Sequence, residues 1–237
     1  MDASNYQRQF SAGGIGTPDE ASGPRIEKVR KFFAESSAKK ILDVGCANGA
    51  ILKPLLADGR ELHGVDISKV LVDKANANGI KAVLHDVETA PLPYNAGTFD
   101  AVFCGETIEH QVDTDWLLSE INRVLKPGGF LVLTFPNIRT VLSLAMMAFF
   151  DIPPMYAARY RASHVRDFTL KTIRIALFEN GFVIRRAVGS AFYLPKIGEF
   201  GKGLATWFPS WTHTTVVAAE KKFDAFYPPK NPTERIY

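Results

Sequence analysis

The chain has 237 residues, a hydrophobic content of 46% and a formal net charge of +3 at pH 7. This length suits one α/β domain with added segments, and the small charge, without a long basic run, argues against a nucleic-acid partner. Two cysteines, Cys46 and Cys104, are too few for a disulfide framework. Because no signal peptide is recognised, we expect a protein of the reducing cytoplasm.

The N-terminal residues, 1–23, are polar and glycine-rich, and we interpret them as a flexible arm. The arm either orders over a ligand or is a disordered terminus. A helical pattern of apolar residues begins at Pro24 and continues to Phe33, with proline in the first turn. From Lys39 onward, strand and helix patterns alternate, which is typical of a parallel sheet with crossover helices.

The segment after Lys40 has the sequence ILDVGCANGAIL. A short apolar run ends in Asp43 and in a turn that carries Gly45 and Gly49, after which apolar residues return at helical spacing. This pattern predicts a buried strand, a tight loop and the start of a helix. Because glycine has no Cβ, a ligand can approach this backbone closely. The spacing differs from the dinucleotide fingerprint G-x-G-x-x-G, since Ala47 replaces a glycine, and this disfavours a nicotinamide-dependent oxidoreductase.

Three further apolar runs predict strands at 61–66, 80–84 and 99–104. The first ends in Asp66, about twenty residues past the glycine loop, where a carboxylate can accept hydrogen bonds from ribose hydroxyls. Asp86 follows the second run. We also expect helices at 68–77, capped by Ser68, and at 114–125, and a strand at 130–135 after a sharp turn at 126–129.

The alternation breaks after Asn137, and we define residues 138–168 as a lid-like insertion. Its apolar run at 141–150 is shorter than the about twenty residues that span a bilayer. One interpretation is a helix of a substrate lid packed on the body. The other is an interfacial helix that docks on a membrane or holds a lipid-linked acceptor, because adjacent arginines and tyrosines suit lipid headgroups. These side chains are Tyr156, Arg159, Tyr160 and Arg161.

After the insertion we expect a helix that reaches Leu177, strands at 182–188 and 214–219, and an extended tail at 223–237. An aromatic loop lies between the two strands. Its side chains line an acceptor pocket or cover a sheet edge, and they are Phe192, Tyr193, Trp207, Phe208 and Trp211.

Four runs, ILDVGCANG, VDIS, HDVETAPLPYNAGTFDAVFCGETIEH and INRVLKPGGFLVLTFPN, together resemble class I S-adenosylmethionine-dependent methyltransferases in order and spacing. The resemblance implies a Rossmann-like α/β fold over 1–237, with a seven-stranded, mostly parallel sheet, helices on both faces and a helical insertion after the fifth strand. It also implies a set of S-adenosylmethionine-binding residues: Asp43, Gly45, Cys46, Gly49, Asp66, Ile67, Asp86, Val87 and Cys104. In this set, Asp66 binds the ribose hydroxyls, Ile67 contacts adenine and Asp86 accepts from the adenine amino group.

The methyl acceptor is expected near Glu106, Glu109 and His110. If a helix starts here, these residues stand at i, i+3 and i+4 and share one face. Two carboxylates and an imidazole make either a site for a hard metal or a general-base cluster. The E-x-x-E-H arrangement is similar to that of ubiquinone-biosynthesis O-methyltransferases and small-RNA 2′-O-methyltransferases. That similarity implies a divalent cation, and the similarity to the small-RNA enzymes adds His164 as a further ligand. Two carboxylates favour Mg²⁺ or Mn²⁺, while the imidazole keeps Zn²⁺ or Fe²⁺ open. His110 is the catalytic base if no metal binds.

The resemblance implies S-adenosylmethionine-dependent O-methylation of a small, sugar-linked or lipid-linked acceptor. N-methylation and a catalytically silent cofactor-binding subunit are the alternatives. The interfacial interpretation of the insertion adds a peripheral contact with the inner face of a membrane through 141–150.

Overall fold

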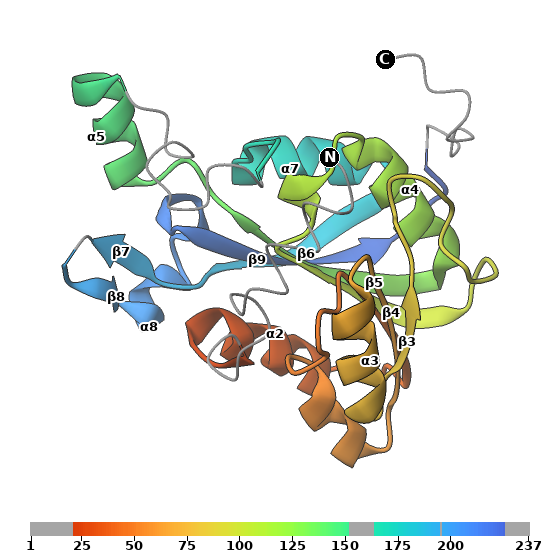
Figure 1. Ribbon diagram of the computed structural model, residues 1–237. Helices are drawn as coiled ribbons and strands as arrows, with labels where there is room; N and C mark the ends of the chain where they lie inside the picture. The colour runs from red at the N-terminus through yellow and green to blue at the C-terminus, as the bar shows by residue number, and fades with distance from the viewer. Residues whose placement is uncertain (1–20, 152–163, 195, 226–237) are drawn as a thin grey trace.

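The computed structural model describes residues 21–151, 164–194 and 196–225 (Figure 1). Its main sheet has seven strands in the order β3-β2-β1-β4-β5-β9-β6, and a second sheet pairs β7 with β8. Strands β1 to β5 run parallel, whereas β9 lies antiparallel between β5 and β6. The predicted seven-stranded, mostly parallel α/β fold is therefore confirmed. The strands are β1 Lys40–Val44, β2 Glu61–Asp66, β3 Lys81–Leu84, β4 Phe99–Gly105, β5 Leu125–Pro136, β6 Phe182–Gly189, β7 Phe192–Leu194, β8 Gly198–Phe200 and β9 Thr214–Lys221.

Helices cover both faces of the sheet, α2 and α3 on one side and α4 and α7 on the other (Figure 1). The helices are α2 Pro24–Ala34, α3 Lys69–Ala77, α4 Thr114–Val124, α5 Val141–Phe150, α7 Leu170–Glu179 and α8 Lys202–Ala205, with 3₁₀ turns η2 Lys53–Asp58, η3 Ile108–His110 and η4 Pro209–Trp211. Ser68 occupies the N-cap position of α3, as predicted, but its side chain makes no capping hydrogen bond.

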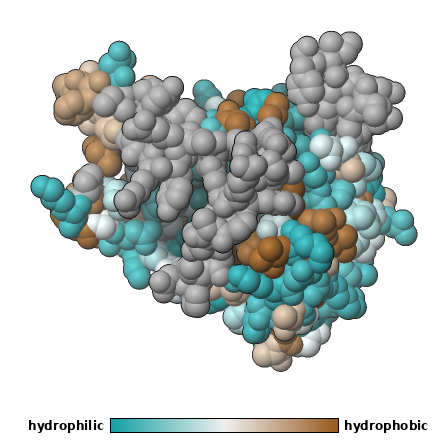
Figure 2. Space-filling model, viewed as in Figure 1, coloured by the Kyte–Doolittle hydropathy of each residue, from teal (hydrophilic) through white to brown (hydrophobic). Residues whose placement is uncertain are grey.

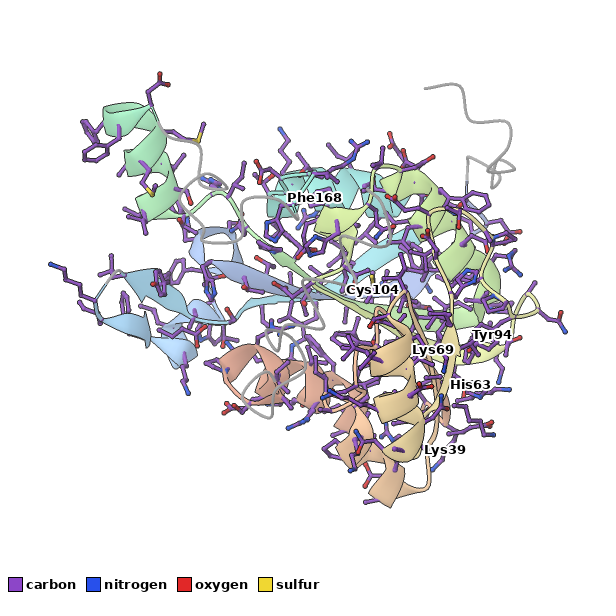
Figure 3. All side chains as sticks on the ribbon, viewed as in Figure 1. Lys39, His63, Lys69, Tyr94, Cys104 and Phe168 are labelled. Atoms are coloured by element: carbon purple, nitrogen blue, oxygen red, sulfur yellow. The ribbon has the colours of Figure 1, made fainter. Side chains whose placement is uncertain are left out.

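Two hydrophobic clusters fill the spaces between the sheet and its helices, one on each face. Successive strand residues alternate between the clusters: Leu42 and Cys104 belong to the α4 and α7 side, whereas Ile41 and Phe103 belong to the α2 side. The strands read as continuous apolar runs in the sequence because both of their faces are buried. Cys104 consequently lies at the centre of the molecule (Figure 3).

The segment after the glycine loop is the 3₁₀ turn η2 rather than the expected start of an α-helix. Pro54 lies in its first turn, and Gly59 ends it in the left-handed region at φ 68°. Proline is tolerated in a first turn, whose amides have no partner within the helix, so Gly59 is what limits this segment to six residues. Of the apolar residues expected at helical spacing, Leu52 and Leu55 belong to the core, whereas Leu56 is only partly buried.

The aromatic segment between β6 and β9 contains a β-hairpin, although a loop was predicted there. β7 pairs antiparallel with β8, and α8 and η4 follow. Trp207 is 81% exposed, so it neither lines a pocket nor covers a sheet edge, which corrects the expectation for this residue. Trp211 instead packs against the guanidinium of Arg139, 4.5 Å from its ring centroid.

Helix α5 confirms the helix predicted at 141–150, and it projects from the body of the protein (Figure 1). Phe149 and Phe150 are 80% and 69% exposed, and Ser143 is the buried residue of this helix. The apolar surface of α5 is visible in Figure 2. These aromatic side chains of α5 are thus not packed on the body, whereas the role of the insertion as a substrate lid stays a prediction.

Several expected segments fall outside the described residues: 1–20 of the arm, 226–237 of the tail, and Tyr156, Arg159, Tyr160 and Arg161 of the insertion. Within the described ranges, no helix has the length and apolarity needed to cross a membrane.

Candidate functional site

The glycine loop that follows β1 is a tight turn held from two sides. The amides of Gly45 and Cys46 both donate to the carbonyl of Val65 in β2, at 2.9 and 3.1 Å. From α2, Arg30 donates through Nε to the carbonyl of Ile51 at 2.9 Å. The loop is therefore fixed to the neighbouring strand and to α2 at once.

Gly45 and Gly49 adopt φ values of 77° and 74°, in the left-handed region that favours glycine. A Cβ at Gly45 would overlap the Thr107 side chain, and one at Gly49 would overlap Ile80. Protein atoms thus fill the space on the Cβ side of both residues. The glycines are needed for the turn and for close packing, which is a different reason from the close ligand approach that we expected.

Asp66 stands at the end of β2, beside the loop. Its Oδ2 accepts from the amide of Ala47 and its Oδ1 from the amide of Ser68, both at 2.8 Å. A carboxylate offers about four lone-pair positions, so two remain for a ligand. Burial raises the pKa of Asp66, while the two amide hydrogen bonds lower it.

Asp43, at the end of β1, is buried, and its Oδ1 has no hydrogen-bond partner among the described residues. Burial raises the pKa of Asp43 well above its usual value, and the nearby Asp66 carboxylate raises it further. Burial likewise raises the pKa of the Cys46 and Cys104 thiols. Both thiols are therefore protonated at neutral pH, and neither is an activated nucleophile.

The other expected cofactor residues follow β2 and β3 at the same carboxyl edge of the sheet. Ile67 comes directly after Asp66. Asp86 Oδ1 accepts from the amide of Glu88 at 3.0 Å, and the carbonyl of Val87 accepts from the Trp116 indole at 2.9 Å. The carboxyl edge of a parallel sheet is where ligands bind in open α/β folds. The residues predicted for the cofactor thus gather along one edge.

Glu106 does not share a helix face with Glu109 and His110, contrary to the prediction. Its φ of 51° places it in the left-handed region, before the short 3₁₀ turn η3. Its Oε1 accepts from the Thr134 hydroxyl at 2.9 Å, and that hydroxyl oxygen in turn accepts from Arg25 at 3.3 Å. Glu106 is therefore hydrogen-bonded to β5, and its charge still acts on Glu109.

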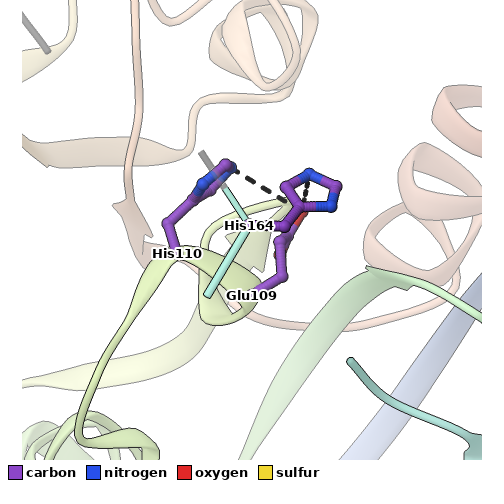
Figure 4. A group of neighbouring side chains, drawn as sticks. All are labelled: Glu109, His110 and His164. Carbon is purple, nitrogen blue, oxygen red and sulfur yellow. Dashed lines mark ion pairs between the residues drawn. The ribbon is translucent and has the colours of Figure 1, made fainter. Parts of the chain in front are cut away.

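Glu109, His110 and His164 form a compact cluster (Figure 4). One ligand atom from each lies within 4.8 Å of the others. Oε1 of Glu109 is 3.9 Å from Nε2 of His110 and 4.0 Å from Nε2 of His164. The two imidazole rings meet edge to face, with centroids 5.0 Å apart.

Backbone hydrogen bonds bring His164 to this cluster. The amides of Val165 and Arg166 both donate to the carbonyl of Glu109, at 2.9 and 3.1 Å. The end of the insertion is thereby fastened to η3. The sequence predicted His164 as an additional ligand, and the structure brings it next to Glu109 and His110, without Glu106.

The Glu109 carboxylate is buried at 1% exposure, and neither of its oxygens has a hydrogen-bond partner in the described part of the chain. Burial raises the pKa of Glu109 well above its usual value, and the charge of Glu106 raises it further. A buried carboxylate without partners is costly unless a cation or a proton satisfies it. Two imidazoles on the same side fit a divalent cation, because nitrogen and carboxylate oxygen are ligands that such ions share.

Thr107 and Arg25 are site residues that the sequence did not reveal. The Thr107 hydroxyl donates to the carbonyl of Val44 at 3.2 Å and fills the space beside Gly45. Arg25 reaches Thr134 from a helix far away in the chain. Neither contact has a local sequence signal, because both join residues that are distant in sequence.

Comparison with known proteins agrees with this geometry. Residues 42–133 match a family model described as a methyltransferase domain. A ubiquinone biosynthesis O-methyltransferase of Xanthomonas oryzae pv. oryzae is 28% identical over 197 residues, which cover 79% of this chain and 80% of the relative. A 27-O-demethylrifamycin SV methyltransferase of Amycolatopsis mediterranei is 29% identical over 124 residues, covering 49% and 46% of the two chains.

Solved structures share the fold at low sequence identity. An S-adenosylmethionine-dependent methyltransferase of Archaeoglobus fulgidus superposes with a TM-score of 0.63 at 18% identity, covering 91% of this chain and all of the other. A methyltransferase of Thermotoga maritima, named as a possible histamine N-methyltransferase, superposes with a TM-score of 0.63 at 18% identity. The match covers 84% of this chain and 88% of the other. The family model matched over residues 42–133, the sequence relatives and the seven-stranded sheet together support a class I S-adenosylmethionine-dependent methyltransferase.

Proposed function

We propose that the protein transfers a methyl group from S-adenosylmethionine to a hydroxyl oxygen of a small, sugar-linked or lipid-linked acceptor, with a divalent cation held by Glu109, His110 and His164. The observation that carries this proposal is the buried Glu109 carboxylate, which has no hydrogen-bond partner among the described residues and lies 3.9 and 4.0 Å from two imidazoles. The relative named for ubiquinone biosynthesis supports oxygen as the methylated atom.

The cofactor would lie along the carboxyl edge of β1 to β4. We assign Asp66 to the ribose hydroxyls, through the lone pairs that Ala47 and Ser68 leave open. Ile67 would contact adenine, and Asp86 and the Val87 backbone would bind its polar edge. The loop residues Asp43, Gly45, Cys46 and Gly49, with the Cys104 carbonyl, would surround the methionine part.

Methyl transfer breaks the bond from sulfur to the methyl carbon, forms the bond from oxygen to carbon, and releases the hydroxyl proton. The protein contributes alignment and the exclusion of water rather than covalent chemistry. A bound divalent cation would supply positive charge that lowers the pKa of the acceptor hydroxyl. Because Glu106 stands apart, the cluster has two imidazoles and one carboxylate, which favours Mn²⁺ over Mg²⁺.

A second candidate mechanism needs no metal. His110 lies 3.9 Å from Glu109 and keeps 16% of its side chain exposed, so it can meet an acceptor and take its proton as a general base. In that mechanism Glu109 orients the ring and stabilises the imidazolium. The two mechanisms differ in their response to chelation.

The test is turnover with S-adenosylmethionine labelled in its methyl group, against hydroxylated acceptors, beginning with ubiquinone precursors, and against matched amines. Exhaustive treatment with EDTA should abolish oxygen methylation, and Mn²⁺ should restore it. Glu109→Gln should lose both activity and bound metal. Glu179→Gln, a substitution at the far end of α7, is the matched control and should change neither. Full activity after chelation would leave His110 as the base, and turnover of amines alone would reject the oxygen acceptor.

We further propose that α5 contacts a membrane or a lipid-linked acceptor. Its support is the run of exposed apolar side chains that includes Leu144, Met147, Phe149 and Phe150. An apolar helix at an interface gains free energy by burying such side chains among acyl chains. Flotation with phosphatidylcholine vesicles tests this contact, and a Phe149→Ser, Phe150→Ser variant should float less than the wild type. Equal flotation of the two proteins would reject it.

A further inference from the structure

A surface cavity of about 340 Å³ opens beside the N-terminus of α7, and none of the expected cofactor residues lines it. It is built by three segments that are distant in the sequence: the stretch after β5, the first turn of α7 and η4. Its lining residues are Arg139, Thr169, Leu170, Lys171, Arg174 and Ser210.

The lining carries three cations and no acid. Arg139, Lys171 and Arg174 form no ion pair with any residue of the described ranges. Elsewhere on the surface, exposed arginines do find acids: Arg185 pairs with Glu220 and Arg186 with Glu35. Like charges gathered in one concavity repel each other, so the arrangement favours an anion between them.

Contacts with Trp211 and Asn137 restrict the conformation of Arg139. Its guanidinium lies over the Trp211 ring at 4.5 Å, and its backbone amide donates to Asn137 Oδ1 at 3.0 Å. A guanidinium fixed in this way presents its planar fork to a phosphate or carboxylate with little loss of side-chain entropy.

The first turn of α7, which lines the cavity, adds uncharged hydrogen-bond donors. The Thr169 side chain caps α7 by accepting from the Thr172 amide at 3.2 Å. The amides of Leu170 and Lys171 have no hydrogen-bond partner among residues that the structure describes. These amides sit at the positive end of the helix dipole, which favours an anion.

We propose that this cavity binds a phosphate group, and that the group belongs to the methyl acceptor. Three cations with amide and hydroxyl donors match a dianion with three terminal oxygens better than they match a single carboxylate charge. Guanidinium groups can bind two of those oxygens at once, while Lys171 contributes a point charge.

The cavity lies close enough along the chain to the candidate metal cluster for one acceptor molecule to contact both. Residues 164–169 connect them: the Val165 amide bonds to the Glu109 carbonyl, and the Phe168 carbonyl accepts from the Ile138 amide at 3.0 Å. His164 and Thr169 are separated by at most about 17 Å of extended chain. One acceptor of moderate length can therefore reach both places. This link to the acceptor rests on the proposed function, whereas the binding of phosphate does not.

The first measurement is a calorimetric titration of the full-length protein with inorganic phosphate at low ionic strength, without acceptor or turnover. We expect saturable binding that weakens by about tenfold or more in a Lys171→Gln, Arg174→Gln variant, because the phosphate loses two charged hydrogen-bond donors. Both side chains are exposed, so the variant should fold. Lys74→Gln removes an equally exposed cation from α3 and should leave phosphate affinity unchanged.

A second measurement separates the two sources of a phosphate group. Phosphatidylcholine vesicles with and without phosphatidylglycerol are added to the wild type and to the double variant. Binding that needs phosphatidylglycerol, and is lost in the double variant, identifies a lipid headgroup. Phosphate binding with no preference between the vesicles identifies a soluble phosphate ester.

Absence of saturable phosphate binding, or equal binding by wild type and double variant, would overturn the inference. S-adenosylmethionine affinity is measured in the same samples. Lost phosphate binding beside intact cofactor binding rejects the phosphate site alone, whereas absent cofactor binding counts against the proposed function.

Discussion

Asp66 holds the glycine loop and is also the residue that we assign to the cofactor ribose. Its two loop contacts use one lone pair on each oxygen, through the amides of Ala47 and Ser68. We predict that Asp66→Ala weakens S-adenosylmethionine binding by about 1–3 kcal/mol, because ribose hydroxyls lose a charged acceptor. Calorimetric titration measures this. Asp73→Ala, which removes an exposed carboxylate from α3, is the control. Unchanged affinity in a folded Asp66→Ala protein would contradict the assignment.

Asp43 gives a prediction about pH. Its pKa in the folded protein is raised, first by burial and then by Asp66, above the value of about 3.9 in an unfolded chain. A carboxyl group with a raised folded pKa adds stability that is fully present below the unfolded pKa. That stability is lost as pH rises through the folded value, since the unfolded state then releases its proton first. Stability measured by urea unfolding should therefore shift in favour of Asp43→Asn, relative to the wild type, as pH increases from about 4. Parallel pH curves for the two proteins would show that Asp43 is not perturbed.

At the scale of elements, α5 differs from every helix that covers the sheet. Phe149 and Phe150 are largely exposed, whereas Phe135 of β5 is fully buried. We predict that Phe149→Ser with Phe150→Ser changes the free energy of unfolding by no more than about 0.5 kcal/mol per site. Phe135→Ala should cost about 3–5 kcal/mol, because it leaves a cavity. Urea unfolding compares them. A large loss of stability in the α5 variant would mean that this helix packs against the protein in solution.

The elements that could be predicted from the sequence are those whose burial shows in a local pattern. Strands β1, β2 and β4 are apolar runs closed by an acid or a glycine. Helix α7 lies between its N-cap Thr169, which forms a capping box, and its C-cap Asn180. The apolar pattern gave a wrong prediction where the backbone conformation of a single residue interrupts the helical spacing. The left-handed Gly59 ends the segment after the glycine loop as a short 3₁₀ turn, and the left-handed Glu106 breaks the helix expected to align three ligands.

At the scale of the whole molecule, the candidate metal cluster exists only because distant segments meet. Glu109 and His110 follow β4, whereas His164 comes from the far end of the insertion and is fixed by the Glu109 carbonyl. The residue types of the cluster could be predicted from the sequence. The hydrogen bond from Thr134 to Glu106 could not, because this contact depends on the register of β4 beside β5. Local motifs thus predicted the kind of ligand group at the site better than they predicted which residues form it.

This arrangement predicts a stabilisation of the whole protein by metal. A cation that binds only the folded state adds about 2.7 kcal/mol at a concentration one hundred times its dissociation constant. For a chain of this size that corresponds to a rise in Tm of about 5–10 °C. Mn²⁺ should therefore raise the Tm of the wild type, and EDTA should reverse the rise. His164→Gln should lose most of it, because the cation would no longer join the end of the insertion to η3. Glu179→Gln, away from the cluster, should keep the full shift. The same rise in His164→Gln as in the wild type would mean that any bound metal is held without His164, and that the insertion does not take part in the site.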